Sequence, residues 1–323
     1  MNLLAHGHRR VALALTLAGA ALLASCGGGD PVVPFEPTRV LAFGDENSVI
    51  TSEGRKYTIN TLATDADGVK TIDCELGGLW VQRLATGYGL VFPDCNPNAV
   101  PDPRSRIYAV AFSKVADLEA QIRAHLDTPD TFSGKDLVTL LTGQNDVLAQ
   151  YALYDGTNEA QLQAAIYAAG LELARQVSRI ASAGGKVLVS TVPDLSRSPF
   201  ALAENTAAGD TSRSALIGRL VAKFNEGLRV GIAGESGAEV AIMLTDELIQ
   251  SMAKFPSSYG MSDVTTPACD EALAATVDLC TTDTLVTGAT ANNHLWADET
   301  HISAGAHIYV GSLAGTRARA NPF

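Results

Sequence analysis

The chain has 323 residues, with 35 acidic and 23 basic side chains and a net charge of −12 at pH 7. A surface this acidic gains nothing from contact with a phosphate backbone, so the composition excludes nucleic acid as a partner. Hydrophobic residues make up 46% of the chain, which is typical of a globular protein with a buried core. The length suits one large domain.

The first segment of the chain is typical of a targeting signal. A basic Arg9-Arg10 pair precedes an apolar run that is too short to span a bilayer comfortably. We therefore predict a signal peptide over residues 1–25, a tether rich in Gly and Pro over 26–38, and a domain over 39–323. Removal of this leader changes the net charge to −14.

The apolar run ends in Leu23-Ala24-Ser25-Cys26, which resembles a bacterial lipobox. In such a motif the Cys becomes the lipidated first residue of the mature chain, so we expect a lipid anchor at Cys26. Gly27, rather than Asp, follows the Cys and favours the outer membrane. The expected location is the bacterial cell envelope, with attachment through lipid and not through a basic patch. The alternative is an ordinary secretory signal in which Cys26 is incidental.

Four cysteines remain in the predicted domain, and an even number in an exported chain indicates disulfides. Three connectivities are possible. We favour local pairing, Cys74 with Cys95 and Cys269 with Cys280, because each pair would close a loop rich in Pro, Asp, Thr and Gly. A zinc site is the alternative, but the chain offers no Cys-x-x-Cys spacing to support it.

From residue 39 onward, short apolar runs alternate with longer segments of helical periodicity. The runs expected to form buried strands are 39–44, 106–111, 136–141, 186–191 and 240–244. The segments expected to form helices are 78–88, 115–126, 159–183, 211–232 and 303–317. This alternation predicts an α/β fold, a single three-layer domain in which a parallel sheet carries helices on both faces.

Two polar, turn-rich segments interrupt this alternation, at residues 51–73 and 256–293. Loops of this kind in α/β enzymes shape access to the substrate site. We expect both to lie above the sheet.

The pair most indicative of chemistry is Asp298 and His301, three residues apart near the C-terminus. A carboxylate at this spacing can orient an imidazole ring and stabilise the imidazolium that forms when His takes a proton. Two upstream turns could complete the pair, because Gly44-Asp45 follows the first predicted strand and Gly143-Gln144-Asn145-Asp146 follows the third.

Together these blocks resemble those of the SGNH (GDSL-type) hydrolases, a family of esterases and lipases. The resemblance extends over residues 39–317 through Val192-Pro193-Asp194-Leu195, Pro199 and Phe224-Asn225. It implies an SGNH-hydrolase fold of the flavodoxin-like type. It also implies hydrolysis of a carboxylic ester bond in a small-molecule or lipid substrate, without a cofactor. We expect a monomer.

The resemblance also implies roles for individual residues. His301 would be the base and Asp298 its orienting partner. The side chain of Asn145 would donate to the oxyanion, a contribution typically worth about 3 kcal/mol of barrier, unless it simply caps the next helix. Ala111 stands where the family has Gly and would supply the second, backbone donor. His307 is expected to be structural or solvated.

One residue departs from the family pattern. The nucleophilic Ser that directly follows Gly-Asp is replaced by Glu46, while the next Ser of the motif is retained as Ser48. In one hypothesis Ser48 is the nucleophile. In a second, Glu46 attacks as a carboxylate or His301 activates water. In a third, the site is weak or inactive and binds an acyl or glycan ligand. A metal held by Glu46, His301 and Asp146 is a further alternative.

The electrostatics of Glu46 bear on these hypotheses. If Glu46 reaches His301 while Asp298 holds the other ring nitrogen, two carboxylates raise the pKa of the imidazole and weaken it as a base. We therefore expect low esterase activity. We also expect Glu46, Asn145, Asp298 and His301 to converge at the carboxyl ends of the strands, where open α/β sheets bind ligands. In a purely structural surface lipoprotein they would lie apart.

Replacing Cys26 tests the predicted anchor. In a Cys26→Ala chain we expect the protein to leave the membrane fraction or to remain unprocessed, because the lipid can no longer be attached. Fractionation of cells, with a Gly28→Ala chain as the matched control, measures this. Normal membrane retention of the Cys26→Ala protein would contradict the prediction.

Overall fold

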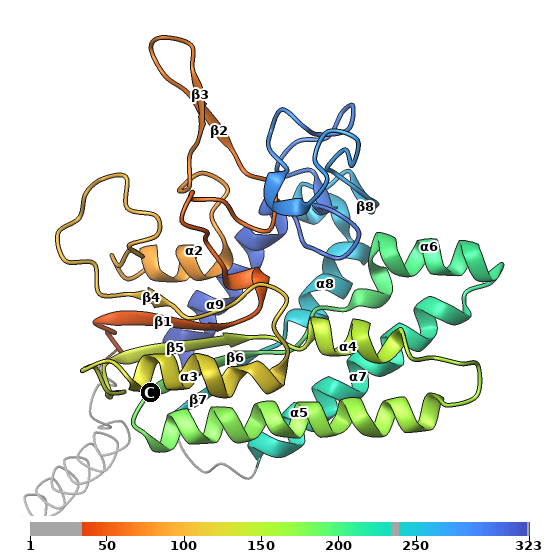
Figure 1. Cartoon of the computed structure of the whole chain (residues 1–323), viewed down its shortest axis with the longest axis horizontal. Helices are drawn as coiled ribbons and strands as arrows, with labels where there is room; N and C mark the ends of the chain where they lie inside the picture. The colour runs from red at the N-terminus through yellow and green to blue at the C-terminus, as the bar shows by residue number, and fades with distance from the viewer. Residues whose placement is uncertain (1–33, 234–238, 322) are drawn as a thin grey trace, which may run out of the picture. The chain divides into compact units, whose positions relative to one another are not determined.

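A five-stranded parallel sheet forms the centre of the computed structural model, which describes residues 34–233, 239–321 and 323 (Figure 1). Its strand order is β4-β1-β5-β6-β7. The strands are β1 (Arg39–Gly44), β4 (Arg106–Ile107), β5 (Asp136–Leu141), β6 (Lys186–Ser190) and β7 (Val240–Met243). Every residue of β1 and β5 is buried, as parallel strands covered on both faces require.

Helices cover both faces of this sheet, and Figure 1 draws α2 and α9 on one side and α5 and α7 on the other. The helices are α2 (Trp80–Thr86), α3 (Leu118–Leu126), α4 (Gln144–Tyr151), α5 (Glu159–Ser182), α6 (Pro199–Ala208), α7 (Ser212–Ala233), α8 (Thr245–Lys254) and α9 (Ala304–Ala320). The α/β fold with a parallel sheet between two helical layers is therefore confirmed. No described helix is long and apolar enough to cross a bilayer.

Some predicted elements differ from the observed ones. The predicted strand over 106–111 is wrong beyond Ile107, because the chain leaves the ladder there. The backbone N–H groups of Tyr108 and Ala109 both donate to the carbonyl oxygen of Ala42. Three further helices, α4, α6 and α8, were not predicted; they have 8, 10 and 10 residues.

The predicted signal peptide and Cys26 lie outside the described residues. Residues 35–323 form one compact unit, and the end of the predicted tether, 35–38, belongs to it.

Both polar segments project beyond the sheet at the top of Figure 1. The first contains an antiparallel hairpin of β2 (Leu62–Thr64) and β3 (Lys70–Ile72). The second contains β8 (Asp263–Pro267), which pairs in parallel with β9 (His294–Trp296). Disulfides join Cys74 to Cys95 and Cys269 to Cys280, the pairing favoured from the sequence.

The side chain of Asn60 ties the two polar segments together through hydrogen bonds to both. Its Nδ2 donates to the carbonyl oxygens of Asp278 and Cys280 at 3.1 Å each, across the second segment. Its Oδ1 accepts the backbone N–H of Lys56 at 2.9 Å, within the first. Lys56 is fully buried, and its Nζ donates to the carbonyl oxygens of Cys74 and Leu76 at 3.0 and 2.8 Å.

Removing either disulfide should lower the free energy of unfolding by up to about 3 kcal/mol, because the cross-link restricts the unfolded chain. We expect this loss in a Cys269→Ala/Cys280→Ala protein and in a Cys74→Ala/Cys95→Ala protein, measured by urea unfolding. Peptide mapping without reductant verifies the pairing in the wild type. Free thiols, or a link between Cys95 and Cys269, would refute it.

Candidate active site

The first site segment is the turn that follows β1. Gly44 has a φ of +128°, and a Cβ there would lie 1.9 Å from the carbonyl oxygen of Leu141 on β5, so only glycine permits this close approach. Asp45 then accepts hydrogen bonds from the backbone N–H and side-chain amide of Asn47 at 3.1 and 2.9 Å. This capped turn begins the 3-10 helix η1 (Glu46–Ser48) and holds Glu46 fully buried.

The second site segment follows β4 and supplies a backbone donor. The N–H of Phe112 donates to Glu46 Oε2 at 2.7 Å. Phe112 has a φ of +61°, a conformation that is uncommon for a bulky residue and is kept only where the surroundings fix it. The neighbouring Ser113 provides that restraint, because its Oγ donates to the carbonyl oxygen of Gly44 at 2.8 Å. The N–H that reaches Glu46 therefore belongs to Phe112, one residue after the expected Ala111, and the role of Ala111 as an oxyanion donor stays a prediction.

The third site segment is the start of α4. Gly143 has a φ of +115°, and a Cβ there would lie 2.3 Å from Cζ of Phe224 on α7. This tight turn places Asn145 in the first turn of the helix. Its Nδ2 donates to Glu46 Oε2 and Oε1 at 3.0 and 3.2 Å, and to the carbonyl oxygen of Ser113 at 3.1 Å.

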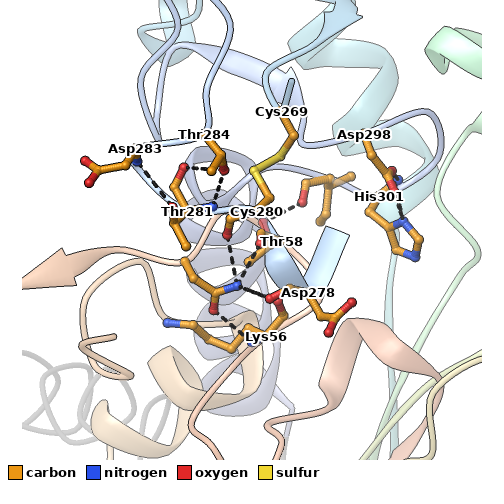
Figure 2. The surroundings of a disulfide bond; sticks show 12 residues. Lys56, Thr58, Cys269, Asp278, Cys280, Thr281, Asp283, Thr284, Asp298 and His301 are labelled. Atoms are coloured by element: carbon orange, nitrogen blue, oxygen red, sulfur yellow. Dashed lines mark hydrogen bonds and ion pairs between the residues drawn. A yellow bond between two sulfur atoms is a disulfide. The ribbon is translucent and has the colours of Figure 1, made fainter. Parts of the chain in front are cut away.

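The fourth site segment, shown in Figure 2, holds Asp298 and His301. His301 Nδ1 lies 2.8 and 2.9 Å from the two carboxylate oxygens of Asp298. Asp298 Oδ1 also accepts the backbone N–H groups of Thr300 and His301, at 2.9 and 2.7 Å. These local bonds explain the three-residue spacing. The other ring nitrogen, Nε2, lies 3.3 Å from Glu46 Oε1.

The polar segments brace this last turn. The backbone N–H of Cys269 donates to the carbonyl oxygen of Ala297 at 2.9 Å, and Ala297 in turn donates to that of His301 at 2.7 Å. From the first polar segment, Thr58 Oγ1 donates to the carbonyl oxygen of Ile302 at 2.9 Å. The His301 backbone is thereby held from both sides.

Charge at the site is set by the two carboxylates around one imidazole. Burial alone would lower the pKa of His301, but hydrogen bonds and charge from Asp298 and Glu46 raise it to about 10. Burial opposes ionisation of Glu46 and Asp298 as well, yet the bonds to His301 lower the pKa of both carboxyl groups. At neutral pH the site is therefore an imidazolium between two carboxylates.

This geometry has a direct chemical consequence. The Phe112 N–H and the Asn145 amide converge on one point, as donors for an oxyanion must, but the carboxylate of Glu46 already accepts both bonds. A protonated His301 also cannot take a proton from a nucleophile. In the wild-type protein the donor site is occupied by the chain's own anion.

Other candidate residues do not join the hydrogen-bonded group around Glu46 and His301. Ser48 Oγ is buried and has no hydrogen-bond partner in the described part of the chain, His301 included. Asp146 Oδ2 accepts the backbone N–H of Val115 at 3.0 Å, and the described residues contain no group of three or more His, Cys, Asp or Glu side chains placed to hold a metal. His307 is fully buried, and burial lowers its pKa to about 3, which fits a structural role.

Sequence reasoning missed Phe112, Thr58 and Asn60. Thr58 and Asn60 lie in a polar segment whose only visible signal was its turn-rich composition. Phe112 gave no signal, because a bulky apolar residue is rarely expected at positive φ.

The comparisons with known proteins give only remote similarities. No family model matches the sequence, and no curated protein matches it. Among solved structures, the fold is similar to a member of the lipolytic protein G-D-S-L family from Veillonella parvula, at 12% identity and a TM-score of 0.41, over 87% of this chain and 95% of that one. It is also similar to an acetyl xylan esterase, AlAXEase, at 14% identity and a TM-score of 0.39, over 86% and 98%.

The charge state of His301 is directly measurable. By nuclear magnetic resonance we expect its imidazole to titrate near pH 10 in the full chain, and at lower pH in a Glu46→Gln protein, because one of the two carboxylates is then neutral. His294 and His125 serve as internal controls, since burial lowers the pKa of both rings. A His301 that titrates near its ordinary pKa of about 6.5 would contradict this charge assignment.

The same shift makes stability depend on pH. The pKa of His301 is higher in the folded than in the unfolded chain, so protonated His301 contributes to the free energy of unfolding. This contribution is fully present below about pH 6.5 and disappears as the pH rises through about 10. Urea unfolding of the wild type should therefore show a loss of stability across this window. The loss should be smaller in the Glu46→Gln protein. Equal losses of stability in the wild type and the Glu46→Gln protein would contradict the ion pair between Glu46 and His301.

Proposed function

We propose that this protein is an exported hydrolase of carboxylic esters with an SGNH-type catalytic framework, and that Glu46 keeps its activity low. One observation carries the proposal. Nε2 of an Asp298-oriented His301 is directed at residue 46, and the Phe112 N–H and the Asn145 amide converge on the same position. A base, its orienting carboxylate and two oxyanion donors are the parts that ester hydrolysis needs.

A hydroxyl at position 46 would complete this framework. Its oxygen would attack the ester carbonyl while its proton passes to His301 Nε2, forming a tetrahedral intermediate. The oxyanion would accept from Phe112 N–H and Asn145 Nδ2. Protonated His301 would then give its proton to the departing alcohol, and water would hydrolyse the acyl ester with His301 again as base. Asp298 would stabilise the imidazolium in both steps.

In the wild type the two routes that use Glu46 or water each meet an obstacle. Attack by the Glu46 carboxylate, with loss of the alcohol and hydrolysis of the resulting anhydride, requires Glu46 to leave three donors. Activation of water by His301 requires the ring to lose a proton that both carboxylates stabilise. Slow hydrolysis follows from either route.

We propose that this activity operates in the cell envelope, with the domain anchored as a monomer through a lipid on Cys26. The basis is the leader and lipobox-like motif of the sequence. A small-molecule or lipid ester would be the substrate.

A second candidate function is binding of an acyl or glycan ligand without turnover. It is favoured by an aromatic pair beside the site, in which Phe112 is exposed and Tyr57 is half-buried. The Phe112 side chain is 62% exposed, and its ring packs edge-on against Tyr57 with 5.5 Å between centroids. Aromatic faces of this kind bind apolar chains and rings. Loss of binding in a Phe112→Asn protein, which tolerates positive φ, would support this function.

Changing Glu46 to Ser tests the hydrolase proposal. Because general-base catalysis typically contributes a factor of about 10² to 10⁴, we expect Glu46→Ser to hydrolyse a short aryl ester at least about 100-fold faster than Glu46→Ala. The Glu46→Ala protein is the matched control, since it removes the carboxylate without adding a nucleophile. Initial rates on the full chain provide the measurement.

The outcomes separate the hypotheses for the nucleophile. A folded Glu46→Ser protein that stays inert would refute the idea that one substitution silences the site. An active wild type that loses its rate on Ser48→Ala would identify Ser48 as the nucleophile. An active wild type that loses its rate on Glu46→Gln, but not on Ser48→Ala, would indicate carboxylate or water chemistry.

A further inference from the structure

Two arginines line a cavity between α2 and α9, on the helical layer that these two helices form. Arg83 belongs to α2 and Arg319 to α9, and the cavity has a volume of about 310 Å³, at the lower end of the range for ligand sites. Within the described residues, neither guanidinium forms an ion pair with a carboxylate. This is notable in a chain with 35 acidic side chains.

The helix sequence makes room for both side chains. A Cβ at Gly311 would lie 2.8 Å from Cβ of Arg83, and a Cβ at Gly315 would lie 3.1 Å from Nη1 of Arg319. Each glycine inside a helix costs about 1 kcal/mol relative to alanine. α9 therefore gives up helix stability at the two positions, one turn apart, that border the arginines.

The contacts of the two arginines fix their positions but leave donors available. Arg83 Nε donates to the carbonyl oxygen of Gly78 at 3.2 Å, and its Nη atoms have no partner among the described residues. Arg319 Nη2 donates to the carbonyl oxygen of Gly87 at 2.9 Å, and its guanidinium lies 5.0 Å from the centre of the Tyr88 ring. Arg83 is half-buried, and burial lowers its pKa with no acid to compensate. Both guanidinium groups therefore retain donors from which an anion can accept hydrogen bonds.

A second cavity adjoins the first and is more apolar. It has a volume of about 510 Å³ and shares Arg83 and Gly87 with the first, while Leu90, Val91 and Phe92 line it further along. Glu75 also lines this cavity, but its carboxylate is exposed and already accepts from the side chain of Asn98 at 3.2 and 3.3 Å. Cationic and apolar surfaces therefore meet at Arg83.

We propose that a phosphate-bearing amphiphile binds across these two cavities. Its phosphate accepts hydrogen bonds from Arg83 and Arg319, whose planar forks suit phosphate oxygens. Its hydrocarbon chain lies against Leu90 and Val91, which are both half-buried, and removes their remaining apolar surface from water. The adjoining apolar cavity argues for an amphiphile over a free phosphate ion.

The position of the site fits a lipid ligand. Phe35, at the start of the described domain, packs edge-on against Phe323, four residues beyond Arg319, with ring centroids 5.1 Å apart. From Cys26 to Phe35 a chain can reach no more than about 30 Å. The expected lipid anchor would keep this end of the domain near the membrane surface.

Octyl phosphate provides a probe that contains no carboxylic ester, so hydrolysis cannot confuse the result. We expect saturable binding to the full chain by calorimetry below the micelle concentration. Arg83→Gln and Arg319→Gln should each weaken binding at least about tenfold, because each removes a charge-assisted hydrogen bond. Arg179→Gln on α5 is the matched control and should leave binding unchanged. Octyl glucoside, with the same chain and no phosphate, should not compete.

Further arms distinguish the possible ligands. Inorganic phosphate that binds as tightly as octyl phosphate would assign the site to a free ion and overturn the amphiphile. Unchanged octyl phosphate affinity in both arginine variants would overturn the site itself. Circular dichroism and a thermal melt verify folding, and Arg319→Gln, at an exposed position, decides the outcome if Arg83→Gln does not fold.

Discussion

The buried carboxylate of Glu46 is the interaction on which the arrangement of the site depends. Transfer of an unpaired carboxylate from water to a protein interior costs several kcal/mol, so such a group persists only where donors surround it. Here the donors come from Phe112, Asn145 and His301, which lie 66, 99 and 255 positions further along the chain. One anion therefore joins four segments at the carboxyl edge of the sheet.

This anion changes what the donors do. In an ester hydrolase, oxyanion donors gain strength only as negative charge develops on the reacting carbonyl oxygen, and this difference accelerates the reaction. In this chain the negative charge is permanent and belongs to Glu46. The same N–H groups therefore stabilise the resting protein, and the imidazolium of His301 strengthens that resting state further. The result is a stable ion-pair network in the resting protein.

The sequence by itself determined the layered fold and the local part of the site. Residues 39–44 and 136–141 are continuous apolar runs, and such runs fit strands that are buried on both faces. Asp298 and His301 could be paired from spacing alone, because Asp298 Oδ1 accepts the backbone N–H of His301 within one turn. Both disulfides match the local pairing that the sequence favoured among three possible connectivities, and each closes a short loop. These features depend on neighbours close in the chain.

Only the tertiary structure decided which groups meet across the site. The N–H that donates to Glu46 belongs to Phe112, and the turn that directs it is fixed by a bond from Ser113 to Gly44, 69 positions earlier in the chain. Likewise, the direction of η1 brings Glu46 to the imidazole and leaves Ser48 buried without a partner among the described residues. Side-chain direction in a three-residue turn depends on what packs around it, and those neighbours come from distant segments that no local pattern specifies.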